Sequence, residues 1–63
     1  MTTPEKIYAF GQTYNQDGEA CPESGTLEDA IAWCKGASAS LDLFDDAGFR
    51  KGWVKADGSW SLT

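Results

Sequence analysis

The chain has 63 residues, of which 10 are acidic and 5 are basic, and its net charge at pH 7 is −5. This acidic balance repels nucleic acid and anionic membranes and attracts basic surfaces. Hydrophobic residues make up 41 % of the chain, which argues against disorder, and no apolar stretch is long enough to span a membrane.

The length predicts a single domain over residues 1–63, near the lower size limit for folding without disulfides or metals. Residues 1–5, which include Pro4, are expected to form an irregular start. No charged start leads into an apolar run of the kind found in signal peptides. We therefore expect a cytoplasmic protein that is a monomer and makes no membrane contact.

The first strand is expected over residues 6–14, which are rich in β-forming side chains. Alternation along the strand places Ile7 and Ala9 on one face and Tyr8 and Phe10 on the other. Apolar side chains on both faces suit a strand in the interior of a sheet.

Residues 15–25 form a polar loop that is long for so small a domain, which makes it a candidate functional segment. Its Asn15-Gln16-Asp17-Gly18 stretch resembles part of a calcium-binding loop. However, Thr13 stands at the first ligand position, and Ser24 stands where a bidentate Glu is needed. The stretch therefore indicates a turn and no metal site.

A helix is predicted over residues 27–35, with Thr26 as its N-cap. Asp29 lies three residues after the cap, where its carboxylate completes a capping box, and together with Glu28 it complements the helix dipole. Lys35 and Gly36 indicate the end of the helix, since glycine readily adopts a positive φ. Four apolar residues at helical spacing form the stripe that faces the core: Leu27, Ala30, Ile31 and Cys34.

After a linker over residues 36–40, three strands are expected over residues 41–45, 49–56 and 59–63. The element order is then β-α-β-β-β, an α+β domain in which one helix packs on one face of a mainly antiparallel sheet.

Two turns set the pairing of these last three strands. We favour a three-residue loop with a left-handed Gly48 over a four-residue loop, because it pairs Leu41 with Trp53. Asp57-Gly58 predicts a two-residue type I′ turn, which pairs Trp53 with Leu62 and Lys55 with Trp60. These registers place six apolar side chains on one face below the helix: Leu41, Leu43, Phe49, Trp53, Trp60 and Leu62.

Catalytic and metal-binding chemistry has little support in the sequence. The chain has no His, so the usual general base near neutral pH and one of the main zinc ligands are missing. No base is in evidence to activate Cys34, and there is no glycine-rich phosphate loop. We expect no enzyme activity, no catalytic residue, no metal and no cofactor. Cys21 and Cys34 are expected to be reduced, with a bridge between them as the alternative.

Basic and aromatic residues alternate over residues 49–55, a pattern found in sheets that stack nucleotides. In the predicted register Phe49 and Trp53 belong to the core, Lys51 and Lys55 extend past them on the same face, and Arg50 lies on the other face. The alternative function is therefore a small module that binds single-stranded nucleic acid or carbohydrate, although the net charge opposes the former. Exposed aromatic residues suited to sugars would be Tyr8, Phe10, Tyr14 or Trp33.

The acidic residues are the leading candidates for a partner-binding surface. Carboxylates on a rigid scaffold can imitate phosphates and occupy a basic protein groove built for nucleic acid. The alternative is that these charges only keep the protein in solution. The candidate residues are Asp17, Glu19, Glu23, Glu28, Asp29, Asp42, Asp45 and Asp46.

A small acidic domain with the Thr26-Leu27-Glu28-Asp29 helix start and the Asp57-Gly58 hairpin resembles the small phage-encoded anti-CRISPR proteins. It is most similar to those directed at type I systems, including I-C. The resemblance covers the whole chain as a profile of size, charge and element order. It implies a stoichiometric inhibitor in the host bacterial cytoplasm. Such an inhibitor binds a subunit of a Cascade-type surveillance complex as a DNA mimic, blocks target DNA and does not itself bind nucleic acid. Arg50, Lys51 and Lys55 then imply a mixed-charge contact or a face turned away from the partner.

Overall fold

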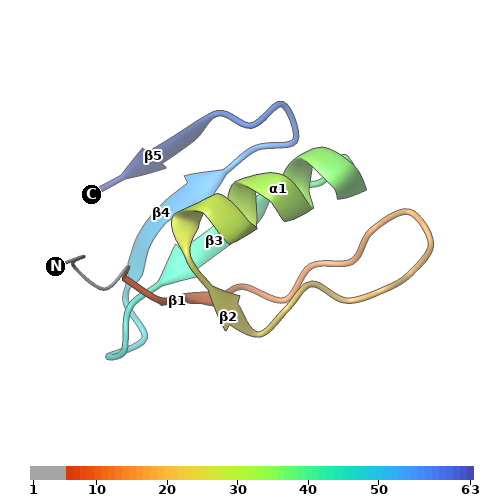
Figure 1. Ribbon diagram of the computed structural model, residues 1–63. Coiled ribbons are helices and arrows are strands. Elements are labelled where there is room, and N and C mark those ends of the chain that lie inside the picture. Colours follow the sequence, from red (N-terminus) through yellow and green to blue (C-terminus); the bar gives the residue numbers. More distant parts are fainter. Residues whose placement is uncertain (1–5) are drawn as a thin grey trace, which may run out of the picture.

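The computed structural model describes residues 6–63, and the irregular start expected over residues 1–5 lies outside this range. The described chain forms one helix, α1 (Leu27–Ala37), which lies along one face of an antiparallel sheet (Figure 1). The sheet has the strand order β2-β1-β3-β4-β5. The expected α+β class and β-α-β-β-β order are confirmed, with a two-residue β2 in addition. The strands are β1 (Tyr8–Phe10), β2 (Ser24–Gly25), β3 (Leu41–Phe44), β4 (Arg50–Val54) and β5 (Trp60–Leu62).

β1 is shorter than the expected strand but lies in the interior of the sheet, between β2 and β3. Tyr8 and Phe10 are buried in the core, whereas Ala9 is exposed. The expected loop over residues 15–25 is not entirely irregular. Its first part is the tip of a hairpin whose arms meet at Tyr14 and Ala20, and its end is β2.

The helix begins as the sequence predicts. The side chain of Thr26 accepts a hydrogen bond from the N–H of Asp29, and the Asp29 carboxylate accepts one from the N–H of Thr26. The helix ends two residues later than predicted, because Ala37 continues the buried stripe three residues after Cys34. Gly36 is therefore helical. The left-handed residue that ends α1 is Ser38, with φ 53°, and not Gly36.

Three hairpin turns share one construction. In each, the N–H of a left-handed glycine donates to the carbonyl three residues before it: Gly18 to Asn15, Gly48 to Asp45 and Gly58 to Lys55. The turn expected at Asp17-Gly18 and the three-residue loop that ends at Gly48 are both confirmed.

The type I′ turn expected at Asp57-Gly58 is wrong. Only Gly58 has a positive φ, and the N–H of Lys55 donates to the carbonyl of Ser59, so this loop also has three residues. The Asp57 carboxylate accepts bonds from Ser59 and supports this loop without a left-handed conformation of its own. Val54 therefore pairs with Trp60, in place of Lys55.

A β-bulge in β4 decides which side chains face the helix. Phe44 pairs with Arg50, but Leu43 pairs with Gly52, so Lys51 is the extra residue on the β4 side. From there on Leu41 pairs with Val54, and not with Trp53 as expected. A shift of one residue exchanges the two faces of a strand.

The bulge places Val54 opposite Leu41 on the helix side, where Val54 is fully buried, whereas Trp53 lies on the opposite face of the sheet with exposed Asp42. The expectation that Phe49 and Trp53 belong to the core is therefore wrong. Phe49 lies between the turn and β4, and 69 % of its surface is exposed.

Candidate functional site

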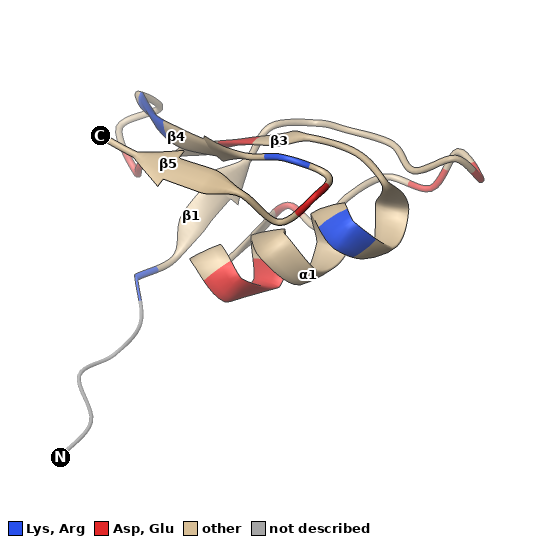
Figure 2. Ribbon diagram, turned by 90° about the horizontal axis from the view of Figure 1, so that it is seen from above, with Lys and Arg blue, Asp and Glu red and all other residues tan. Residues whose placement is uncertain are grey.

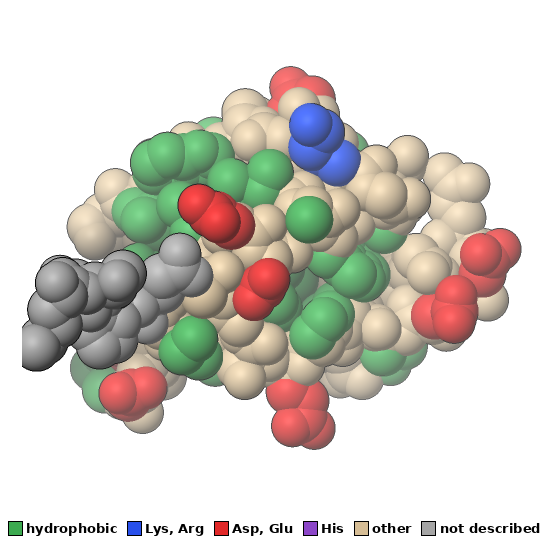
Figure 3. Space-filling model, in the orientation of Figure 1, with side chains coloured by type: hydrophobic (Ala, Val, Ile, Leu, Met, Phe, Trp, Pro, Cys, Tyr) green, Lys and Arg blue, Asp and Glu red, His purple; other side chains and the backbone are tan. Residues whose placement is uncertain are grey.

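The structure distributes the eight acidic candidates over four separate segments and does not gather them in one place. Two lie at the tip of the first hairpin, one precedes β2, two occupy the first turn of α1, and three belong to β3 and the turn after it. Figure 3 accordingly shows acidic side chains at several positions on the helix side, with uncharged surface between them. In chain order the eight are Asp17, Glu19, Glu23, Glu28, Asp29, Asp42, Asp45 and Asp46.

Three of these carboxylates already have structural roles. Asp29 caps α1. Asp42 lies in β3, and its Oδ1 is 3.0 Å from Nη2 of Arg50. Asp45 accepts hydrogen bonds from the N–H groups of Ala47 and Phe49, and its Oδ2 is 3.7 Å from Nζ of Lys51. The backbone bond from Phe49, followed by that from Ala47 and the charge of Lys51, holds the pKa of Asp45 below its ordinary value of 3.8.

The other five candidates form no ion pair within residues 6–63, and all five are exposed. They are available to a basic partner, but from different sides of the molecule. They are Asp17, Glu19, Glu23, Glu28 and Asp46.

The most distinctive surface is the face of the sheet opposite α1. In Figure 2 α1 covers one side of the sheet, and within residues 6–63 no second layer of structure covers the other side. We call this uncovered side the open face. Because of the bulge in β4, Trp53 lies on it, together with Asp42 of β3 and Ser61 of β5. Most single-layer sheets keep their solvent side polar, so an aromatic side chain in this position marks a candidate contact.

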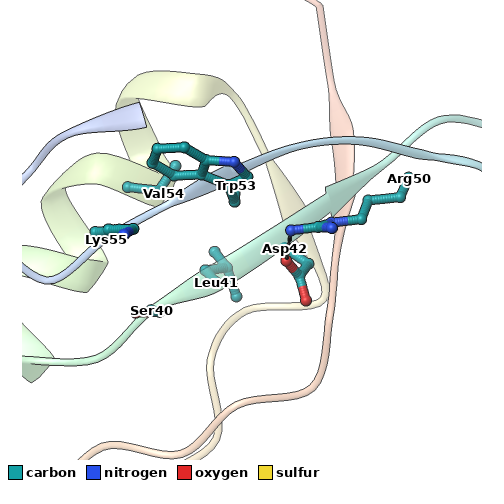
Figure 4. A pocket seen from close by; sticks show the side chains of 7 residues that line it. All are labelled: Ser40, Leu41, Asp42, Arg50, Trp53, Val54 and Lys55. Atoms are coloured by element: carbon teal, nitrogen blue, oxygen red, sulfur yellow. Dashed lines mark ion pairs between the residues drawn. The ribbon is translucent and has the colours of Figure 1, made fainter. Parts of the chain in front are cut away.

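Trp53 and Arg50 both belong to β4, which lies between β3 and β5 in the sheet. They line two adjacent hollows of about 360 and 200 Å³. In Figure 4 the Asp42 and Arg50 side chains point toward each other along the larger hollow, with Trp53 beside them. Nζ of Lys55 is 5.1 Å from the centroid of the Trp53 ring, which is a cation–π distance. The Trp53 groove, as we name it, is lined by Ser40, Leu41, Asp42, Arg50, Trp53, Val54 and Lys55.

The groove contains the apolar ring of Trp53, and around it lie one acidic side chain, Asp42, and two basic side chains, Arg50 and Lys55. The side chains of Arg50 and Asp42 are 58 % and 51 % exposed, so their ion pair adds little stability, at most about 1 kcal/mol. A guanidinium has five N–H donors, so Arg50 has further donors for a partner while it stays paired with Asp42.

Sequence reasoning found Arg50, Trp53 and Lys55 as a motif and placed Arg50 correctly on the face opposite the core, but it assigned Trp53 and Lys55 to the core face. The missed signal is Gly52, because an isolated glycine within a strand pattern suggests a bulge. One bulged residue before Trp53 is enough to move its side chain from the core to the open face.

The proposed sugar-stacking residues and the cysteines occupy other positions. Tyr8 and Phe10 are only 8 % exposed and are not available to a ligand, whereas Tyr14 is 53 % exposed and Trp33 is half-buried. Cys21 and Cys34 are free thiols, as expected. Burial, with a smaller contribution from Cys21, raises the pKa of Cys34, so this thiol stays protonated near neutral pH.

Within residues 6–63, no helix is long and apolar enough to cross a membrane, and no group of three or more potential metal ligands is found. Comparison of the chain with protein-family models, curated proteins and solved structures gives no match.

Proposed function

We propose that this protein is a non-enzymatic interaction module that binds a partner protein through the Trp53 groove. The observation that supports this most directly is the position of Trp53 and Arg50 on a sheet face that no described element covers. Trp and Arg are enriched among the few residues that supply most of the binding energy at protein interfaces. The neighbouring Asp42 adds a second charge that can select the orientation of the partner.

In this proposal the five carboxylates that form no ion pair within residues 6–63 act over a longer range. Their distribution around the molecule does not match a row of phosphates on one face, but the net charge of −5 still attracts a basic partner. Charges at the rim of an interface mainly raise the association rate, whereas buried anchors slow dissociation. We therefore propose that the acidic residues speed the association of the complex and that Trp53 slows its dissociation.

The resemblance to anti-CRISPR proteins suggests the partner. A type I surveillance complex has a basic surface for its target DNA, and a bound domain of this size would block that surface stoichiometrically. The protein would then act as an inhibitor in the bacterial cytoplasm. In this proposal the protein is not a uniform DNA mimic, because its contact surface contains both acidic and basic side chains.

Capture followed by a DNA-binding assay tests this proposal. The tagged protein is incubated with a purified type I surveillance complex, and target-DNA binding is then measured by gel shift. We expect capture and a loss of the shifted DNA at equimolar inhibitor. If the complex is not captured and binds its DNA normally, this choice of partner is wrong.

Three variants separate the two surfaces. Trp53→Gln should abolish capture, whereas the matched control Tyr14→Gln changes an exposed aromatic residue outside the groove and should not. Glu23→Lys combined with Glu28→Lys should slow association and weaken its salt dependence, without faster dissociation. Unchanged capture by Trp53→Gln would refute the role of the groove.

Single-stranded nucleic acid is a second candidate ligand, because Arg50 and Lys55 lie beside the Trp53 ring on the open face. The net charge of −5 opposes it. Titration with an oligonucleotide would quench the fluorescence of Trp53 if the bases stack on it. Quenching that Trp53→Gln removes would favour this candidate over a protein partner.

A further inference from the structure

β5 is an edge strand with free hydrogen-bonding groups. It is the last strand in the sheet order, and β4 is its only neighbour within residues 6–63. The N–H of Thr63 donates to the carbonyl of Lys51, and the N–H of Lys55 donates to that of Ser59. Bonded pairs alternate in an antiparallel ladder, so the backbone groups of Ser61 point toward β4. Those of Trp60 and Leu62 point away from the sheet.

β5 is short, with three residues, but it lacks the charges, prolines and bulges that commonly protect an edge strand from pairing. Residues 59–63 contain no charged residue and no proline, and β5 has no bulge. Trp60, in addition, is 49 % exposed. The opposite edge differs, since β2 has only two residues and follows directly after Pro22 and Glu23. The two edges are therefore unequal, and β5 is the one suited to accept another strand.

The order of side chains along β5 makes it complementary to itself. Trp60 and Leu62 pair with Val54 and Gly52 and lie on the helix side, whereas Ser61 between them lies on the open face. In an antiparallel pair of two such strands, with a two-fold axis at Ser61, each Trp60 lies opposite Leu62 of the other copy. Both of these pairs are of the bonded type, because all four residues direct their backbone groups outward.

We infer that a second copy of this chain pairs with β5 in this register. The two five-stranded sheets then continue into one, with four new backbone hydrogen bonds and two Trp–Leu contacts across the axis. No side chain of residues 59–63 is charged, so this register places no like-charged side chains directly opposite each other, although each copy has a net charge of −5. This dimer replaces the expectation of a monomer that came from the sequence.

The dimer has a consequence for the open face. Because the two-fold axis is perpendicular to the joined sheet, both helices lie on one side and both Trp53 grooves lie on the other. A partner with two equivalent sites would then be bound by both grooves at once. The dimer does not depend on the proposed function, since the Trp53 groove and the outer edge of β5 share no residue.

Sedimentation velocity and amide exchange test the inference on the wild-type chain. The 6.8 kDa chain should reach twice that mass as its concentration rises from about 1 to 500 μM. In the dimer the N–H groups of Trp60 and Leu62 should exchange at least tenfold more slowly than at monomeric concentrations. The N–H of Thr63, which is bonded to Lys51 in each copy, serves as the internal control.

A charged edge provides the second test. Trp60→Lys should weaken dimerisation at least tenfold, while Tyr14→Lys, which adds the same charge to a similarly exposed aromatic position, should leave it unchanged. Circular dichroism checks that both variants are folded. A single-copy mass at every concentration overturns the inference. So does a dimer in which Trp60 and Leu62 exchange freely, because that dimer would use another surface.

Discussion

Gly52 lies where β4 has no room for a side chain, so the variant Gly52→Ala tests the register of the sheet directly. A Cβ at this position would be 2.1 Å from the carbonyl oxygen of Ser61 and 2.7 Å from Cδ2 of Leu62. The Leu62 side chain can rotate, but the Ser61 carbonyl belongs to β5 itself. The added methyl group therefore forces β5 away from β4.

The expected loss of stability is large for this domain. Overpacking of a core typically costs about 1–3 kcal/mol, and a clash with backbone falls at or above the upper end of this range. At roughly 0.05–0.15 kcal/mol per residue, a chain of 63 residues has a total stability of about 3–9 kcal/mol. Gly52→Ala should thus remove a third or more of the stability, or unfold the protein completely.

Gly36 offers a matched control for the same substitution. It lies in α1 without a positive φ, and apart from its chain neighbours and the nearby backbone of α1 no described atom lies within 4 Å of the place that an added methyl group would occupy. Gly36→Ala should therefore stabilise the helix by about 1 kcal/mol. Urea unfolding followed by tryptophan fluorescence measures both effects. With a slope near 1 kcal/mol per molar urea, the midpoint should rise by about 1 M for Gly36→Ala and fall by about 3 M for Gly52→Ala. Equal midpoints for Gly52→Ala and the wild type would refute the register described above.

Three further predictions concern the core, the turn at Asp45 and the thiols. Trp53→Gln should keep a cooperative thermal transition, because the Trp53 side chain lies on the open face. Val54→Gln should abolish the transition, because it buries an amide without hydrogen-bond partners. The opposite result would show that Trp53, and not Val54, belongs to the core. Asp45 should titrate by NMR with a pKa below 3.8. Because the folded-state pKa is lowered, its stabilisation is complete above the ordinary value and is lost as the pH falls through the folded value; a midpoint at or above 3.8 would contradict the bonded turn. A thiol reagent should modify Cys21 in the native protein but Cys34 only after unfolding, since Cys34 is fully buried; equal rates would show that the helix does not cover it.

Local patterns in the sequence predicted the parts of the fold that depend on nearby residues. The capping box at Thr26 and Asp29 uses groups only three residues apart, and a left-handed Gly48 needs no distant partner. Both therefore appear as expected. The α+β class follows from the order of these elements, because one amphipathic helix and several short strands have few ways to bury their apolar faces.

Tertiary structure decided the features that depend on contacts between strands. The extension of α1 to Ala37 depends on burial against the sheet, which a glycine at position 36 does not prevent. The bulge at Lys51 exchanges the two faces of β4, and its consequence is the Trp53 groove. A pattern with a period of two residues does not by itself distinguish the two faces when Trp53 and Val54 are both apolar. The choice between them is made by packing, because Val54 fills the closed space below the helix while Trp53, next to Arg50 and Lys55, retains contact with water.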